Sequence, residues 1–170
     1  AEWMPWMAKS FDVGIYEHPI YGPCTKVRFS LRTDMTWSDG KAVTVADIYF
    51  TWVELDDILK KRGLPPSWHK PTFDHILSFS ILDPCTFEVL LDMKSVYGIG
   101  YAAAIILPKH IWKPIAETRP IQNMDCEPDM ICNGPNRFVE YVANSHILMA
   151  ANKPGVGVKT SLPGSKWVVA

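Results

Sequence analysis

The residue types that most often perform catalysis or bind metals are scattered along this chain, and none forms a recognisable motif. No two histidines stand four residues apart, so the chain lacks a helical metal-binding pair. The nucleophile motif GxSxG and the phosphate-binding motif GxxxxGK[ST] are absent. Gly98 and Gly100 lack the third glycine of a dinucleotide-binding loop. The sequence therefore predicts no catalytic residue, no metal site and no cofactor.

The cysteines favour disulfide bonds over a zinc site. They are Cys24, Cys85, Cys126 and Cys132, and no CxxC pair occurs. Cys24 and Cys85 each follow a proline and open a strand-like run, so their sulfurs would meet if the two strands pair. Cys126 and Cys132 could close a small loop. We expect disulfides at these positions, with four buried free thiols as the alternative.

Aromatic residues have the most to offer a ligand, because the chain contains 7 Trp and is 12% aromatic. Trp37 follows a strand and Trp52 lies on the apolar face of a helix, so we predict that both belong to the core. Trp68 lies in a proline-rich loop, and Tyr97 and Tyr101 share one helix face. Rigid exposed aromatics stack on peptide or sugar ligands. Trp68, Tyr97 and Tyr101 are therefore the ligand-binding candidates, with packing inside the domain as their alternative role.

The strands that must position these residues are short. Residues 26–32 alternate apolar and polar side chains, which is typical of a half-buried strand. Residues 75–82 and 86–91 are predicted to form a hairpin through Asp83 and Pro84. Residues 137–141 and 146–150 predict a second hairpin.

Three helices are predicted between these strands. Thr44 and Asp47 form a capping-box pattern that starts the first helix, and Gly63 ends it. Its apolar face carries Ile48, Trp52, Leu55 and Leu59. Residues 96–106 predict a buried helix, and Pro108 starts a short one that Pro114 should end.

Length and charge limit the functional class. The chain has 170 residues, 48% of them hydrophobic, which is enough for a core without metals or disulfides. The formal net charge of -1 argues against binding nucleic acid through a broad basic face. The longest apolar stretch, residues 99–107, is too short to span a bilayer. The chain opens without a secretion signal, as if it were an excerpt of a longer precursor.

The order of several short motifs resembles family 5 of the extracellular solute-binding proteins, which serve ABC importers of dipeptides, oligopeptides and nickel. The signature region is a strand ending in Leu31-Arg32, the turn Trp37-Ser38-Asp39-Gly40, and a helix opened by Thr44-Val45-Ala46-Asp47. Weaker matches extend the resemblance over about residues 6–154: Trp6–Phe11, Asp83–Leu91, Leu107–His110, Asn133–Phe138 and Asn152–Pro154. Asn133 departs from the pattern, because the family usually has glycine there.

The resemblance implies an α+β fold, a mixed β-sheet with packed helices, belonging to the type II periplasmic-binding-protein class. Family members are several times longer, so this chain would hold residues 1–115 as a peripheral subdomain and residues 116–154 as part of the first lobe. Residues 155–170 would be a loosely held tail. The remaining lobe and an ABC permease in the membrane would be its partners. The location would be extracytoplasmic, with a membrane anchor on the full-length protein.

The function that the resemblance implies is the capture of a solute, with peptides favoured, by closure of two lobes and without bond-breaking chemistry. One alternative is a small secreted hydrolase whose Cys–His or metal site is assembled in space. Another is an adhesion or structural module with exposed aromatics.

Overall fold

The structure is a computed structural model that describes residues 7–67, 70–95, 105–119, 131–134 and 136–152. The chain divides into two compact units. The first contains Ala1–Arg32 and Thr44–Gln122, and the second contains Thr33–Val43 and Asn123–Ala170.

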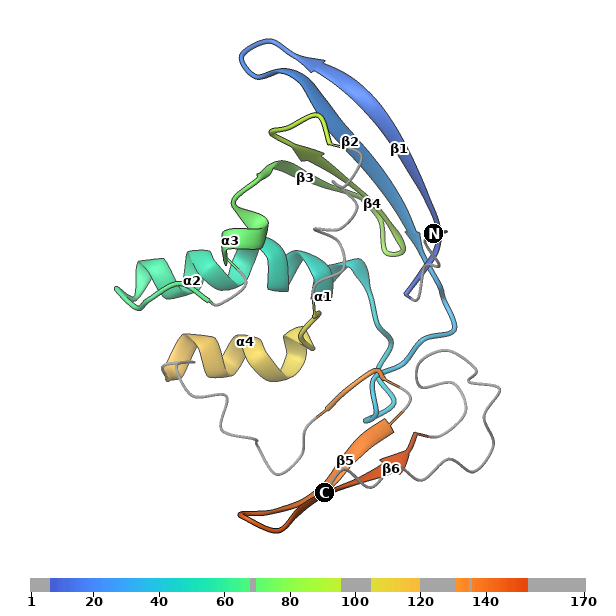
Figure 1. Cartoon of the computed structure of the whole chain (residues 1–170), viewed down its shortest axis with the longest axis vertical. Coiled ribbons are helices and arrows are strands. Elements are labelled where there is room, and N and C mark those ends of the chain that lie inside the picture. The colour runs from blue at the N-terminus through green and yellow to red at the C-terminus, as the bar shows by residue number, and fades with distance from the viewer. Residues whose placement is uncertain (1–6, 68–69, 96–104, 120–130, 135, 153–170) are drawn as a thin grey trace. The chain divides into compact units, whose positions relative to one another are not determined.

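The first unit contains a four-stranded antiparallel sheet in the order β1-β2-β4-β3 (Figure 1). Its strands are β1 Ala8–His18, β2 Gly22–Leu31, β3 Ile76–Asp83 and β4 Thr86–Leu91. Val27, Phe29 and Leu31 are buried on one face of β2, while Arg28 is exposed. The alternation in the sequence therefore predicted this strand correctly, and the predicted hairpin of β3 and β4 is confirmed.

A continuous helical run, residues 45–61, packs on the buried face of this sheet. It consists of α1 Val45–Tyr49, a π-helical turn η1 Phe50–Glu54 and α2 Leu55–Lys61. The backbone N–H of Thr44 donates to the Asp47 carboxylate at 2.9 Å, as the capping pattern predicted. At the other end Gly63 has φ 67° and closes the helix. All four residues of the predicted apolar face are buried.

Trp52 joins the helical run to the sheet. Its ring centroid lies 5.8 Å from that of Phe87 on β4 and 6.1 Å from that of Phe79 on β3, both in edge-to-face orientation. Phe87 in turn stacks on Phe29 of β2 at 5.1 Å. Trp37 is buried as well, so both tryptophans predicted to be core are confirmed.

Helix α4, Lys109–Thr118, packs on the same helical run through a second apolar cluster. Phe50, Leu55 and Leu59 meet Leu107 and Ala116 there. The expectation that Pro114 ends this helix is wrong, because Pro114 lies inside it. Continuing the helix buries Ala116 completely, and this packing outweighs the hydrogen bond that a proline cannot donate.

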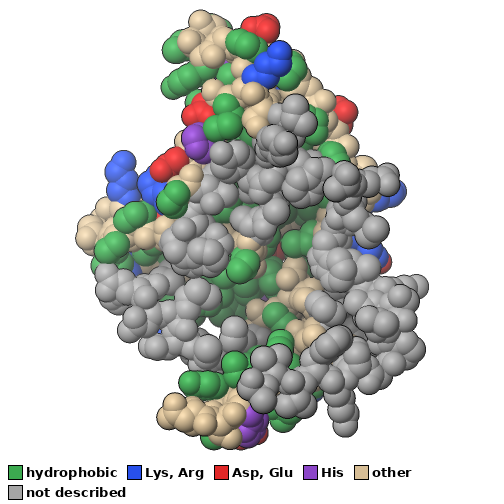
Figure 2. All heavy atoms as spheres, viewed as in Figure 1, with side chains coloured by type: hydrophobic (Ala, Val, Ile, Leu, Met, Phe, Trp, Pro, Cys, Tyr) green, Lys and Arg blue, Asp and Glu red, His purple; other side chains and the backbone are tan. Residues whose placement is uncertain are grey.

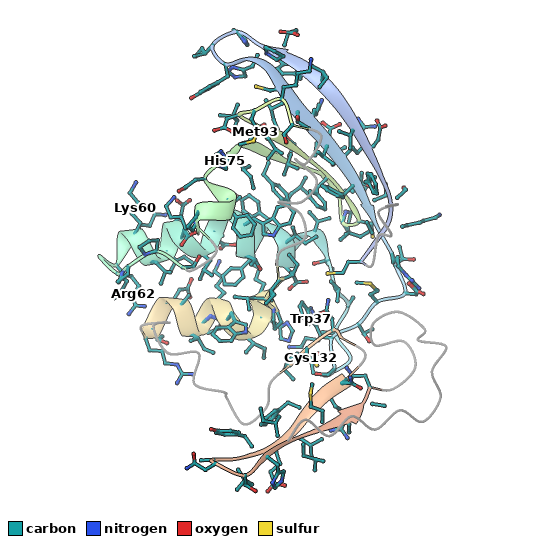
Figure 3. The ribbon with its side chains drawn as sticks, in the orientation of Figure 1. Trp37, Lys60, Arg62, His75, Met93 and Cys132 are labelled. Atoms are coloured by element: carbon teal, nitrogen blue, oxygen red, sulfur yellow. The ribbon has the colours of Figure 1, made fainter. Side chains whose placement is uncertain are left out.

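The second unit pairs β5 Asn136–Val142 with β6 His146–Ala151 in the predicted hairpin. The Trp37–Gly40 turn is held beside Cys132 (Figure 3): Ser38 N–H donates to the Cys132 carbonyl at 2.8 Å. Asn152 Nδ2 donates to the Gly134 carbonyl at 2.5 Å. The sequence motifs around residues 37, 134 and 152 therefore meet within this unit.

The two compact units do not follow the expected boundary between residues 115 and 116, and the assignment of residues 1–115 and 116–154 to a subdomain and a lobe stays a prediction. The expected boundary falls inside α4, whose Ala116 is buried against the helical run of the first unit. The turn segment Thr33–Val43 belongs instead to the second unit.

None of the helices among the described residues is both long enough and apolar enough to cross a membrane.

Candidate functional site

A hollow of about 520 Å³ lies beside the short helix α3, Lys70–Phe73, in the first unit. We call it the α2–α3 hollow. Four aromatic side chains line it: Tyr49, Trp52, Phe73 and Phe79. The size and the aromatic lining are typical of small-molecule sites, which are concave and mostly apolar with a few polar groups.

The aromatic lining is built by ring contacts between separate elements. Trp52 stacks on Phe73 of α3 with centroids 5.3 Å apart and an interplanar angle of 27°. Tyr49 meets Phe79 of β3 edge-to-face at 5.4 Å. Trp52 and Phe73 are buried, whereas Tyr49 and Phe79 are half-buried and present part of their rings to the hollow.

Charged side chains from α2 and α3 also line the hollow, namely Asp56, Asp57, Lys70 and Asp74. Asp56 accepts hydrogen bonds from Ser67 N at 2.7 Å and from Ser67 Oγ at 3.2 Å. The Lys70 ammonium pairs with the Asp74 carboxylate. That hydrogen bond, with the nearby charges of Asp56 and Asp57, raises the pKa of Lys70 above its ordinary value. The charged lining is therefore acidic on balance.

The helix that carries Trp52 is fixed in place by α4 and the residues before it. Thr51 Oγ1 donates to the Asp47 carbonyl at 2.8 Å and accepts from Leu107 N at 2.9 Å. Asp47 Oδ1 accepts from the Lys109 N–H at 2.9 Å. These hydrogen bonds fix the position of the helix along its axis and its rotation about that axis, and so the placement of Trp52 beside the hollow.

Glu54 adds an ion-pair clamp between the same elements. Its carboxylate binds Lys109 Nζ at 2.7 Å and Lys113 Nζ at 2.5 Å. Partial burial would raise the pKa of Glu54, but the hydrogen bonds from the two lysines outweigh it and hold that pKa below its ordinary value.

A second groove, of about 320 Å³, lies on the outer face of the sheet. Tyr16, His18, Lys26, Ser80 and Glu88 are among its lining residues. Glu88 forms ion pairs with Arg28 at 2.5 Å and Lys26 at 3.1 Å, and the pKa of Glu88 is lowered, first by the Arg28 hydrogen bond. The Glu88 carboxylate is thus already neutralised by two cations, so this groove is a weaker candidate for ligand binding than the α2–α3 hollow.

The three aromatic residues predicted to bind a ligand, Trp68, Tyr97 and Tyr101, lie outside the described residues. Sequence reasoning overlooked the α2–α3 hollow itself, for which the adjacent acidic residues Asp56 and Asp57 would have been a signal.

The predicted bridge between Cys24 and Cys85 is wrong. Their strands do pair, but antiparallel, with Thr25 opposite Leu91 and Ser30 opposite Thr86. This register puts the two cysteines at opposite ends of the strand pair, and both are free thiols. The second expected bridge stays a prediction, because Cys126, the expected partner of Cys132, lies outside the described residues.

The chemistry that the described residues support is binding. Within them no group of three or more His, Cys, Asp or Glu side chains could hold a metal ion. The hollow offers aromatic faces and carboxylates, which suit stacking and charge recognition.

A family model matches most of the chain. Residues 2–154 match the family model described as bacterial extracellular solute-binding proteins, family 5 middle. A curated relative, a "Probable ABC transporter-binding protein" of Deinococcus radiodurans, is 24% identical over 139 residues, which are 73% of this chain and 22% of the relative. The chain thus spans about a fifth of the length of that relative.

Solved structures show the same fold. NikZ from Campylobacter jejuni, in complex with Ni(L-His), superposes with a TM-score of 0.66 at 22% identity, over 87% of this chain and 27% of NikZ. The oligopeptide binding protein from Thermus thermophilus, complexed with a pentapeptide, gives a TM-score of 0.67 at 18% identity, over 92% of this chain and 30% of that protein. The expected fold, part of a type II periplasmic-binding-protein structure, is therefore confirmed.

Proposed function

The chain belongs to the bacterial extracellular solute-binding proteins of family 5, and on this basis we propose that it is part of a receptor that captures a small solute for an ABC importer. The observation that carries the proposal is the family match over residues 2–154. The name of the Deinococcus relative and the fold shared with oligopeptide-binding and Ni(L-His)-binding proteins support it. Peptides are the proposed solute class.

The proposed mechanism is capture by closure. The structural relatives are much longer, since this chain covers 27% and 30% of two of them. We therefore assign the first unit to the peripheral subdomain and the second to part of the first lobe. Solute would be enclosed when the remaining lobe closes on the first lobe, and the closed form would dock on the permease. No bond in the solute is made or broken, and the residues proposed to touch it are Trp68, Tyr97 and Tyr101.

The proposed location is outside the cytoplasmic membrane, because solute must be captured before import. A membrane anchor on the full-length protein would keep the receptor near its permease.

Isothermal titration calorimetry tests this function. A mixture of dipeptides to pentapeptides is titrated into the 170-residue chain and into the longest protein that contains it. We expect micromolar binding by the longer protein and none by the chain alone, because half of an enclosing site forms few contacts. Micromolar binding by the chain alone would contradict closure between lobes.

The same samples test the hydrolase alternative. Mass spectrometry of the peptides after overnight incubation should recover them intact. Cleavage products that disappear when thiols are blocked would favour a cysteine hydrolase instead.

A further inference from the structure

The α2–α3 hollow has features that the proposed capture between lobes does not use. All its lining residues belong to the first unit, so the hollow is complete without a second lobe. Trp52 and Val53 belong to the π-helical turn Phe50–Glu54, and Tyr49 precedes it directly. Such turns interrupt α-helices and occur frequently at functional sites.

The charges around the hollow are unbalanced. Asp56, Asp57 and Asp74 contribute three carboxylates, while Lys70 is the one cation among the described lining residues. Lys70 is paired with Asp74, and Asp56 is bonded to Ser67. Asp57 is exposed and forms no hydrogen bond or ion pair within the described part of the chain. A cation entering the hollow would therefore meet one carboxylate that forms no hydrogen bond or ion pair among the described residues, with the charge of Lys70 nearby.

The aromatic lining also carries an unmet polar group. The Trp52 side chain is only 6% exposed, and its Nε1–H has no hydrogen-bond partner among the described residues. The Trp52 ring is fixed between Phe73, on which it stacks, and the edges of Phe79 and Phe87, so it forms a rigid part of the lining.

We propose that the α2–α3 hollow binds an organic amine with a flat apolar body, such as an arylalkylamine. The body packs against Tyr49, Trp52 and Phe79, and the ammonium group lies toward the carboxylate of Asp57. Aromatic faces attract cations as well as apolar surface, so both halves of the ligand are favoured. An anion of the same shape would be repelled by the three carboxylates. This proposal is independent of capture between the lobes.

The test compares two probes of nearly equal shape on the intact chain. Phenethylamine carries a cation at neutral pH, and 2-phenylethanol has the same body without charge. Binding is followed by NMR through the indole N–H resonances, so that the Trp52 signal reports the location. We expect the amine to shift the Trp52 resonance and to bind about tenfold more tightly than the alcohol.

Two substitutions with opposite expected effects follow. Asp57→Asn should weaken amine binding about fivefold and leave alcohol binding unchanged, because it removes one exposed charge. Lys70→Gln should strengthen amine binding about threefold, because it removes the competing cation. Asp12→Asn, on β1 and outside the lining of the hollow, is the matched control and should change neither.

Three results would overturn the proposal. The first is equal affinity for the amine and the alcohol. The second is an unchanged Trp52 resonance when the amine is present at about ten times a millimolar dissociation constant, and the third is an unchanged amine affinity in Asp57→Asn. Because the variants change exposed or half-exposed side chains, circular dichroism of each should match that of the parent chain.

Discussion

Thr51 is a fully buried polar residue whose hydroxyl links two segments that are far apart in sequence. It donates to Asp47 in its own helix and accepts from the backbone N–H of Leu107, which precedes α4. A buried N–H without a partner destabilises a protein by about 1–3 kcal/mol. The hydroxyl therefore matters more for its acceptor role than for its packing.

Replacing Thr51 with Val, which has the same shape, should lower the free energy of unfolding by about 2 kcal/mol, because the Leu107 N–H loses its acceptor. Urea denaturation measures the difference. Thr118→Val is the control: that hydroxyl also donates within a helix, but it is exposed, so its loss should cost less than about 0.5 kcal/mol. Equal losses for the two variants would contradict the bridging role of Thr51.

Glu54 makes stability depend on pH. Its pKa in the folded protein is below the ordinary value of 4.5, so the ionised carboxylate stabilises the fold above that pH. This contribution is lost as the pH falls through the lower, folded-state pKa. Glu54→Gln should therefore destabilise the chain by about 1 kcal/mol at neutral pH, and the difference should shrink below pH 4.5.

Urea denaturation at neutral and acidic pH measures this effect of Glu54. Glu117→Gln, an exposed carboxylate on the same helix α4 that carries the two lysines, serves as the control and should change stability little at either pH. A Glu54→Gln penalty that is the same at both pH values would show that the ion pairs contribute nothing.

At the scale of elements, the end of the long helical run depends on Gly63. Its φ of 67° lies in the left-handed region, and a Cβ added there would meet nothing within 4 Å. A substitution would thus be strained by backbone conformation alone. The same is not true of Gly14 on β1, which also has open space around it but no positive φ.

Gly63→Ala should therefore lower the free energy of unfolding by about 1 kcal/mol, because alanine disfavours the left-handed conformation. Gly14→Ala should be neutral or slightly stabilising, because it only restricts the unfolded chain. Thermal denaturation of the pair distinguishes the two effects. A loss of similar size at both positions would contradict a role for the left-handed cap.

The elements that could be predicted from sequence are those with a one-sided apolar pattern. Val27, Phe29 and Leu31 alternate with more exposed residues along the strand, and the buried residues Ile48, Trp52, Leu55 and Leu59 recur at helical spacing. Strand β1 was not predicted: Val13 and Ile15 are 46% and 55% exposed, so no buried face marks it. Its partner β2 defines it through pairing, which sequence periodicity does not report.

The candidate site was harder to predict than the fold, for a physical reason. The α2–α3 hollow needs Trp52 from the helical run, Phe73 from α3 and Phe79 from β3 to meet in space. Nothing in the local sequence fixes that meeting. The same limit explains the Cys24–Cys85 error, because matching contexts cannot report whether two strands run parallel or antiparallel.

At the scale of the whole chain, the two hairpins have very different surroundings. The β3–β4 hairpin belongs to a four-stranded sheet, while β5 and β6 form a two-stranded sheet within the described residues. Large apolar side chains of this two-stranded sheet are exposed, including Tyr141 at 58% and Ile147 at 45%. Figure 2 likewise shows hydrophobic side chains on the surface at the tip of the β1–β2 hairpin, where Ile20 is 82% exposed.

Two-stranded sheets are marginally stable alone in water. In hydrogen–deuterium exchange of the chain, the amides of β5 and β6 should therefore exchange much faster than those of β3 and β4. The β3–β4 hairpin is an internal control, since its strands are of similar length to β5 and β6. Equal protection of the two hairpins would show that β5 and β6 are stabilised by contacts beyond their own pairing.

The π-helical turn at Phe50–Glu54 also carries information about ancestry. A π-helical turn closes i→i+5 hydrogen bonds and so holds one residue more than an α-helical turn, which shifts the residues after it by about 100° around the axis relative to a regular helix. Here Trp52, inside the turn, meets the sheet, while Leu55 and Leu59, which follow it, meet α4. Relatives with an uninterrupted helix should accordingly align to this chain with a one-residue gap between positions 50 and 54, and they would lack the wall that Tyr49 and Trp52 build together.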